Sequence, residues 1–276
     1  MALLSQHDTP DENYELVAHL DNVKSLSLLL KSINFKEFGI FFASEKGLKV
    51  TVEDAKSIQA SAFMQEEIFE PYTLLVEQVV FKINLTVLIE CLNIFGSNST
   101  ALKMCYQGYG SPLRLILEDG GVITDCSIKT MEPEEMLDFT SASSNVLNKV
   151  ILRSECLKEI FNELDPTTEL VELLLSPDPP YFRLTTAGIA GETKVDIPKD
   201  SDMIESFQCS TLATSRYRYS HVKPSSKPLS VSTKVSIRTD EQGLLCFQYM
   251  VQVDRNISFI EYYCSPVADL EDEHER

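Results

Sequence analysis

A repeated order of patterns constrains this chain more than any other feature of its sequence. A helix-like pattern at 20–33 recurs 132 residues later at 152–165, and a strand-like pattern at 41–50 recurs at 173–182. The residues differ, but the order of the patterns is the same on both sides of an acidic, Ser-rich stretch at 131–145. We therefore expect an internal duplication, with that stretch as a surface connector between the repeats.

The chain has 276 residues, which is enough for two domains that each bury a core of their own. We predict a flexible tail at 1–13, a first domain at 14–130, the connector at 131–145, a second domain at 146–266 and an acidic tail at 267–276. No apolar run approaches the ~20 residues of a membrane span, and the first residues lack the positive charge of a secretory signal. A soluble, intracellular protein is expected.

Each repeat is predicted to combine two helices with a run of antiparallel strands, which is an α+β fold. Apolar residues at three- and four-residue spacing predict helices from Asp21 or Asn22 to Ile33, at 85–95 and at 154–164. The duplication places the fourth helix at 215–223. Alternating apolar residues predict most of the remaining elements as strands.

The sequence carries few signs of catalytic chemistry. Seven cysteines and four histidines are scattered, and no CxxC pair occurs, so we expect reduced thiols and no metal site. Neither a nucleophile elbow nor a phosphate-binding loop occurs, and Gly108–Tyr109–Gly110 fits a strand turn better than a dinucleotide site. The only Asp-x-Glu triplet, 269–271, lies in the predicted acidic tail. We expect a non-enzymatic protein without a cofactor, although carboxylates from distant positions could still converge on a metal.

The net charge of the chain and the positions of its basic residues support different conclusions about nucleic-acid binding. The formal charge of −18 argues against nucleic-acid binding, because phosphate neutralisation needs Lys and Arg. Exposed charges more than ~8 Å apart are largely screened, however, so the positions of the basic residues matter more than the total.

Two large apolar residues fall on otherwise polar strand faces. Phe63 follows Ser57, Gln59 and Ser61, and Met250 shares a face with Gln248 and Gln252. Scattered exposed apolar residues are common. A docking surface is the sharper hypothesis.

Several segments resemble DNA sliding clamps. Ile83–Asn84–Leu85, the ending FIEYYCSP and the duplication resemble the proliferating-cell clamp PCNA. The segments LKMCYQGYGSPLRLILEDGGVITDCSI, KVSIRTD and QYMV are more similar to the Rad-one subunits of the 9-1-1 checkpoint clamp. The resemblance covers about residues 14–266.

The resemblance implies a sliding-clamp fold and a nuclear subunit of a heterotrimeric ring, built with two sister subunits of the Rad-nine and Hus-one types. Such a ring encircles duplex DNA without reading its sequence, is loaded by an ATP-dependent loader, and recruits checkpoint and repair proteins. Two alternatives remain open, a 3′-to-5′ DNA exonuclease and an acidic scaffold without DNA contact.

The resemblance also implies site residues. The DNA-facing residues would be Lys24, Lys31, Lys129, Arg153, Lys158, Arg218 and Lys223. The competing interpretation is that these are solvated helix faces. Glu90 and Asn93 depart from the family, because the homotrimeric clamp carries lysines there, so the first domain would hold DNA more weakly.

A partner-docking pocket would form under the connector from Phe63, Leu137, Phe139, Leu244, Met250, Tyr263 and Pro266. Core packing is the alternative for some of them, Tyr263 above all. Ring assembly would pair open strand edges, which we assign to Val122–Lys129 and Tyr181–Thr186, between neighbouring subunits.

Overall fold

The computed structural model describes residues 13–96, 99–139, 146–189, 191–253 and 256–267. Within them the chain forms two compact units. One draws on the described residues of Met1–Asp54, Ala60–Met136 and Val251–Ile260, and the other on those of Ala55–Gln59, Leu137–Met250 and Glu261–Arg276. The predicted domain boundaries stay predictions. Both predicted tails and the Ser-rich end of the connector, 140–145, lie wholly or almost wholly outside the described residues.

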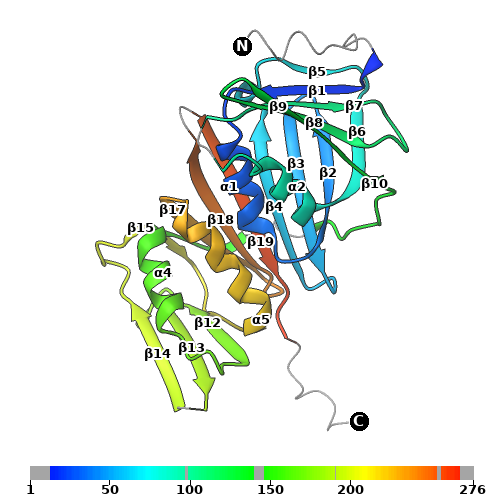
Figure 1. The fold of residues 1–276 in the computed structure, drawn as a ribbon. Coiled ribbons are helices and arrows are strands. Elements are labelled where there is room, and N and C mark those ends of the chain that lie inside the picture. The colour runs from blue at the N-terminus through cyan, green and yellow to red at the C-terminus, as the bar shows by residue number, and fades with distance from the viewer. Residues whose placement is uncertain (1–12, 97–98, 140–145, 190, 254–255, 268–276) are drawn as a thin grey trace, which may run out of the picture. The chain divides into compact units, whose positions relative to one another are not determined.

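The first repeat is the N-terminal half of the chain (Figure 1). Its elements are β1 (Leu16–Leu20), α1 (Lys24–Ile33), β2 (Phe38–Ser44), β3 (Gly47–Asp54), β4 (Ile58–Gln65), the 3₁₀ turn η3 (Glu66–Ile68), β5 (Tyr72–Leu74), β6 (Gln78–Asn84), α2 (Leu85–Leu92), β7 (Ala101–Tyr106), β8 (Leu113–Asp119), β9 (Val122–Ile128) and the short β10 (Thr130–Met131).

The second repeat follows the connector. Its elements are β11 (Val146–Arg153), α4 (Ser154–Glu163), β12 (Leu170–Leu175), β13 (Phe182–Gly188), β14 (Gly191–Ile197), β15 (Ile204–Cys209), β16 (Ala213–Arg218), α5 (Tyr219–Val222), the 3₁₀ helix η4 (Lys223–Ser230), β17 (Lys234–Asp240), β18 (Leu245–Val253) and β19 (Asn256–Cys264).

Strand order confirms the duplication. The order β5-β1-β7-β8-β9 in the first repeat returns as β15-β11-β17-β18-β19 in the second, and β6-β2-β3-β4 returns as β16-β12-β13-β14. The strand pairings are antiparallel wherever the register is defined, for example β1 with β7 and β11 with β17. The predicted α+β fold with two repeated domains is therefore confirmed.

The helices of the first repeat form where the sequence predicts them. In α1 the side chains of Leu26, Leu29, Leu30 and Ile33 are buried, as their spacing requires. Asn22 accepts a hydrogen bond from the backbone N–H of Lys24 at 2.9 Å and so supports the start of this helix. Asn84 caps α2 by accepting from the N–H of Val87 at 3.0 Å.

The predicted helix at 215–223 is wrong over most of its length. Ser215 and Tyr217 are covered while Arg216 and Arg218 are exposed, and this period of two makes the segment the end of strand β16. Only four residues, Tyr219–Val222, form α5, and the 3₁₀ helix η4 with its two prolines continues the chain. The duplication predicted the place of the helical element but not its start.

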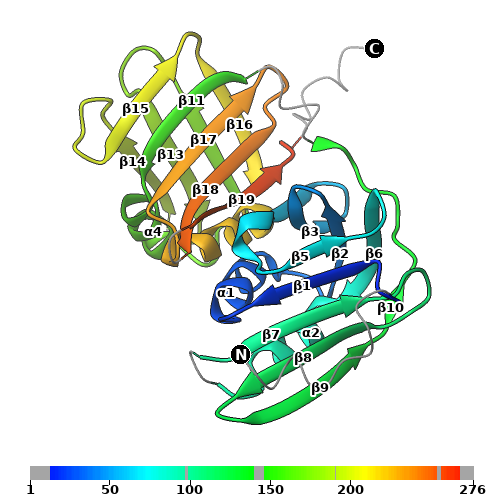
Figure 2. The same cartoon turned by 90° about the horizontal axis from the view of Figure 1, so that it is seen from above.

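One of the two predicted open edges is also wrong. Strand β9 is the outermost strand beside β8, as predicted (Figure 2). In the second repeat, however, β13 lies between β12 and β14, so the open edge belongs to β14. The residues 181–186 are thus an interior strand, and Gly191–Ile197 replaces them at the edge.

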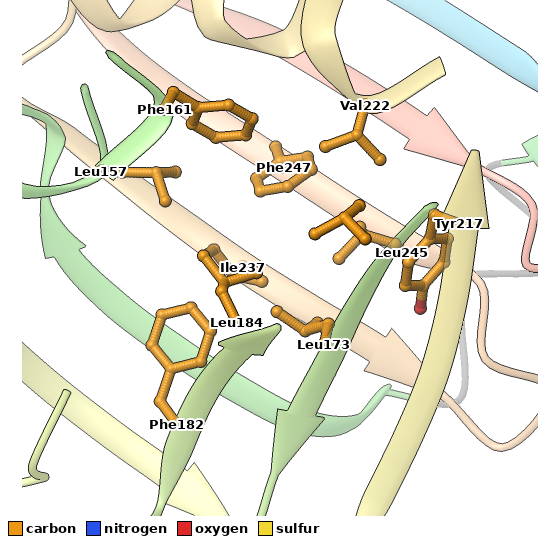
Figure 3. Close-up of a pocket in the computed structure, with 11 residues that line it drawn as sticks. Leu157, Phe161, Leu173, Phe182, Leu184, Tyr217, Val222, Ile237, Leu245 and Phe247 are labelled. Carbon is orange, nitrogen blue, oxygen red and sulfur yellow. The ribbon is translucent and has the colours of Figure 1, made fainter. Parts of the chain in front are cut away.

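The core of the second unit lies between its helices and its strands (Figure 3). Side chains from α4, β12, β13, β16 and β17 enclose an apolar cavity of about 10 Å³, near the lower limit for holding one water molecule. The buried Tyr217 hydroxyl is satisfied, because it donates to the carbonyl of Gly243 at 2.7 Å. Val222 of α5 lines the same cavity, so this helix packs on the core of the unit. Among the described residues, none of the helices is long and apolar enough to cross a bilayer.

Candidate nucleic-acid interface and partner-docking cluster

Helix α1 carries two predicted DNA-facing lysines on its exposed side. Lys24 and Lys31 lie seven residues apart and are both exposed. The Lys31 ammonium donates to Oδ1 of Asn93 at 2.9 Å, and the Ser27 hydroxyl lies 3.1 Å from the same oxygen. Asn93, the C-cap of α2, therefore orients a lysine of the neighbouring helix. Asn93, which we expected to weaken the basic surface because it replaces a lysine, instead helps to position Lys31.

The predicted cations of α4 are accompanied by acids. Arg153 is the last residue of β11 and directly precedes the helix, and Lys158 lies in its second turn; both are exposed. Three glutamates share the exposed side of this helix, Glu155, Glu159 and Glu163. The exposed side of α4 therefore carries charges of both signs, and it attracts phosphates more weakly than its two cations alone would.

A longer basic segment follows in the second repeat. Residues 206–239 contain six Lys and Arg residues and no Asp or Glu. At least three of the six lie near carboxylates: Arg216 is 3.1 Å from Glu172, Lys234 2.7 Å from Glu205, and Arg238 3.7 Å from Glu261. The remaining three, Arg218, Lys223 and Lys227, are exposed on or beside α5 and η4.

Lys227 is a candidate that sequence reasoning missed. It belongs to η4, the 3₁₀ helix that packs against both α4 and α5. The absence of acids from 206–239 was the signal that could have found it. Lys129, another predicted contact, is exposed on the single residue between β9 and β10, away from these helices in the sequence.

The predicted docking residues divide into buried and exposed members. Phe139, Leu244 and Tyr263 form one buried cluster with Cys246, and the rings of Phe139 and Tyr263 stack with their centroids 5.9 Å apart. This favours core packing for these three, Tyr263 included. The connector is held to the second unit by Phe139, whereas Leu137 next to it is 42% exposed.

The other members lie on surfaces. Pro266 is half-buried beside Gly243, whose hydrogens face its ring. Met250 is half-buried opposite Lys234 in the register of β17 and β18. Phe63 belongs to the other unit, where the Lys49 ammonium lies 5.3 Å from the centre of its ring. Leu137, Pro266 and Met250 are therefore the members of the second unit that a partner can reach.

Truncating Phe139 tests its structural role. Phe139→Ala removes the ring that stacks on Tyr263, so we expect the connector to detach and a protease specific for Glu to cleave it at least about tenfold faster, for a loss of over ~1.4 kcal/mol of local stability. Leu137→Ala is the matched control, because this exposed side chain should leave the cleavage rate unchanged. Equal rates for the two variants would mean that Phe139 does not fasten the connector.

The described residues offer no obvious catalytic group. They contain no cluster of three His, Cys, Asp or Glu side chains that could hold a metal ion. The buried Asp240 uses Oδ1 to accept backbone N–H bonds from Gln242 and Leu244, at 2.9 and 2.8 Å, so it shapes a turn. Burial raises the pKa of Cys246 to about 12 and, with the adjacent Cys126, that of Cys91 to about 11. Thiols held protonated in this way are poor nucleophiles.

A family model and several similar known proteins place this chain in the same family. Residues 15–251 match the family described as repair protein Rad1/Rec1/Rad17. The chain is 54% identical over 277 residues to the human cell cycle checkpoint protein RAD1, with 98% of both chains covered. It is 53% identical over 277 residues to the mouse protein of the same name, covering 98% of this chain and 99% of that one.

A more distant relative has an enzymatic name. The DNA repair exonuclease REC1 of Mycosarcoma maydis is 29% identical over 192 residues, which cover 58% of this chain and 42% of that protein. The human and mouse relatives, which match along nearly their whole length, are thus named as checkpoint proteins, and the exonuclease name belongs to a partial match.

Proposed function

Because this chain belongs to the Rad1 family, we propose that it is a non-catalytic subunit of a heterotrimeric DNA clamp in the nucleus. The clamp encircles duplex DNA at damage sites and recruits checkpoint and repair proteins. The similarity to the human checkpoint protein over nearly the whole of both chains carries this proposal.

The charge distribution supports DNA as a partner. Each unit places exposed cations on or beside its helices, Lys24 and Lys31 in the first and Arg218, Lys223 and Lys227 in the second. A protein that encloses DNA needs only weak, sequence-independent phosphate contacts, because topology prevents its escape. A net charge of −18 is compatible with that mode when the basic residues are gathered on particular elements.

The strand edges support assembly into a ring. Of the strands at the ends of the three sheets, β9 and β14 are the longest, with seven residues each. Unpaired backbone groups along such edges favour pairing with another chain. We therefore assign one edge to each of two sister subunits, of the Rad-nine and Hus-one types, and expect an ATP-dependent loader to open and close the ring. Leu137, Met250 and Pro266 in the second unit, and Phe63 in the first, are the proposed contacts for recruited proteins.

Mass in solution tests the assembly. The chain alone should be a monomer by light scattering, and a mixture with the two sister subunits should give a 1:1:1 complex. A stable homotrimer would keep the clamp but remove the checkpoint assignment, and a monomer indifferent to both sisters would contradict the proposal.

A nuclease assay tests the alternative that the REC1 name raises. Duplex DNA labelled at a recessed 3′ end should stay intact with the purified chain and Mg²⁺ or Mn²⁺, because we find no metal-binding cluster in the described residues. Degradation that copurifies with the chain and is lost in a variant of one of its carboxylates, such as Asp240→Asn, would establish the exonuclease. Degradation that persists in such variants would indicate a contaminant.

A further inference from the structure

The first unit contains a pocket that none of the proposed contacts uses. It lies between the start of the connector, strand β6 and the turn that follows β7, and has a volume of about 160 Å³. The lining residues that matter for binding are Val80, Tyr106, Tyr109, Met131 and Glu132.

The pocket opens where the connector leaves the sheet. Strand β10 pairs with β6 for two residues only, Thr130 with Ile83 and Met131 with Lys82. Pro133 has no backbone N–H to continue the ladder, so the connector separates from β6 at Glu132. Val80 and Phe81 of β6 then line a gap that the turn at Tyr109 borders from the other side.

The size of the pocket selects the kind of ligand. Drug-sized ligands occupy sites of ~300–1,000 Å³, whereas a cavity of ~150 Å³ accepts a group as large as benzene. At about 160 Å³ this pocket has room for one side chain. A segment of another protein that inserts a single residue fits it better than a free metabolite does.

The walls combine aromatic rings with a carboxylate. Phe81 and Tyr106 are buried, with ring centroids 4.6 Å apart at 37°, while Tyr109 is 84% exposed at the rim. Glu132 lines the opening. Glu15 lies behind the turn, with its Oε1 so close to Gly108 that a Cβ there would come within 2.7 Å.

Charges around the pocket are mostly negative. Burial raises the pKa of Tyr106, a hydrogen bond with Thr130 opposes that rise, and the charge of Glu15 adds to it. The nearby Lys82 is neutralised, because its ammonium is bonded to Glu134 and lies 5.2 Å from the centre of the Phe38 ring. An electron-rich pocket with acidic neighbours therefore attracts cations.

We propose that this pocket binds an arginine side chain from a basic segment of a partner protein. The guanidinium lies against the rings of Tyr106 and Tyr109 and pairs with Glu132, while its alkyl chain contacts Val80 and Met131. A planar cation uses both the ring faces and the carboxylate, whereas a phenylalanine would leave Glu132 unpaired. This surface shares no residue with the proposed docking contacts.

Methyl NMR of the full chain tests the proposal. With Met and Val methyl groups labelled, N-acetyl-arginine amide should shift the signals of Met131 and Val80 saturably. N-acetyl-citrulline amide, which has the same shape without the charge, should bind at least about fivefold more weakly, as expected for a contribution of ~1 kcal/mol. Glu132→Gln and Tyr109→Ala should each weaken arginine binding by a similar factor.

Controls make the result decisive. Glu135→Gln removes a neighbouring carboxylate outside the pocket and should leave arginine binding unchanged. Both test residues are exposed, so unchanged thermal unfolding will show that the variants fold. The proposal is overturned if arginine gives no saturable shift at Met131 and Val80, if citrulline or N-acetyl-phenylalanine amide binds as tightly, or if Glu132→Gln has no effect.

Discussion

Proline at an outward-facing position of strand β9 is expected to weaken assembly with one sister subunit at least about tenfold, equivalent to over ~1.4 kcal/mol, while the chain still folds. Proline removes a backbone N–H and is compatible with a strand only where that group faces away from the sheet. If β9 pairs with another subunit, the outward N–H groups are the ones that make the interface. A single substitution can therefore separate folding from assembly.

Two neighbouring positions supply the test and its internal control. Successive residues of an edge strand direct their N–H groups to opposite sides, so of Ile123→Pro and Thr124→Pro one loses a bond to β8 and the other loses a bond to the partner. We expect the variant that loses its bond to β8 to lower the melting temperature of the free chain. The variant that loses its bond to the partner should keep that melting temperature and weaken formation of the 1:1:1 complex at least about tenfold, equivalent to over ~1.4 kcal/mol.

A proline at the opposite end of the same sheet completes the experiment. Thr73 lies in β5, the three-residue strand beyond β1, and Thr73→Pro should not affect assembly. If neither β9 variant impairs complex formation, or if Thr73→Pro impairs it as much, β9 is not the interface. The corresponding pair in β14, Thr193→Pro and Lys194→Pro, tests the second edge in the same way.

The sequence predicts the repeat and most of its elements because they leave periodic patterns. Helix α1 buries Leu26, Leu29 and Leu30 in the order that its three- and four-residue spacing indicates. The helix predicted after Thr214 is wrong because the duplication fixes only the order of elements, whereas the alternation of Arg216, Tyr217 and Arg218 indicates a strand. The local period of two was visible in the residues and was correct.

The open edge was predicted at β13 instead of β14 for a different reason. Its residues from Gly191 to Lys194 are all exposed, so no buried face imposes an alternating pattern. Strand β13 does alternate, with Phe182 and Leu184 buried. A regular pattern marks a strand but does not tell which of two adjacent strands lies at the edge.

The candidate site was predictable only in part. Charged residues could be assigned to helices, but the bond between Lys31 and Asn93 joins residues 62 apart. Neighbouring residues of the connector also have opposite environments, since Phe139 is 6% exposed and Leu137 42%. Both features depend on tertiary contacts, which leave no local pattern in the sequence.

Reversing the charge of the basic segment in the second unit is expected to remove most of its share of DNA binding. Arg218, Lys223 and Lys227 are exposed on or beside α5 and η4, within the acid-free residues 206–239. The triple variant to Glu, assembled with both sister subunits, should bind a duplex more weakly at low salt. The slope of log affinity against log salt should fall by about 1 for each DNA phosphate that the variant no longer neutralises.

The decisive comparison holds the total charge constant. Lys46→Glu, Lys56→Glu and Lys199→Glu together change the net charge by the same amount, but these exposed lysines lie in turns outside the helices. A direct phosphate interaction predicts that this control keeps the salt slope of the original complex, because the three turn lysines neutralise no phosphate. Equal losses in both triple variants would indicate a general effect of net charge. Unchanged DNA binding in the triple variant of Arg218, Lys223 and Lys227 would remove these residues from the DNA interface. Unchanged binding after reversing Lys24, Arg153 and Arg218 together would favour an acidic scaffold that does not touch DNA.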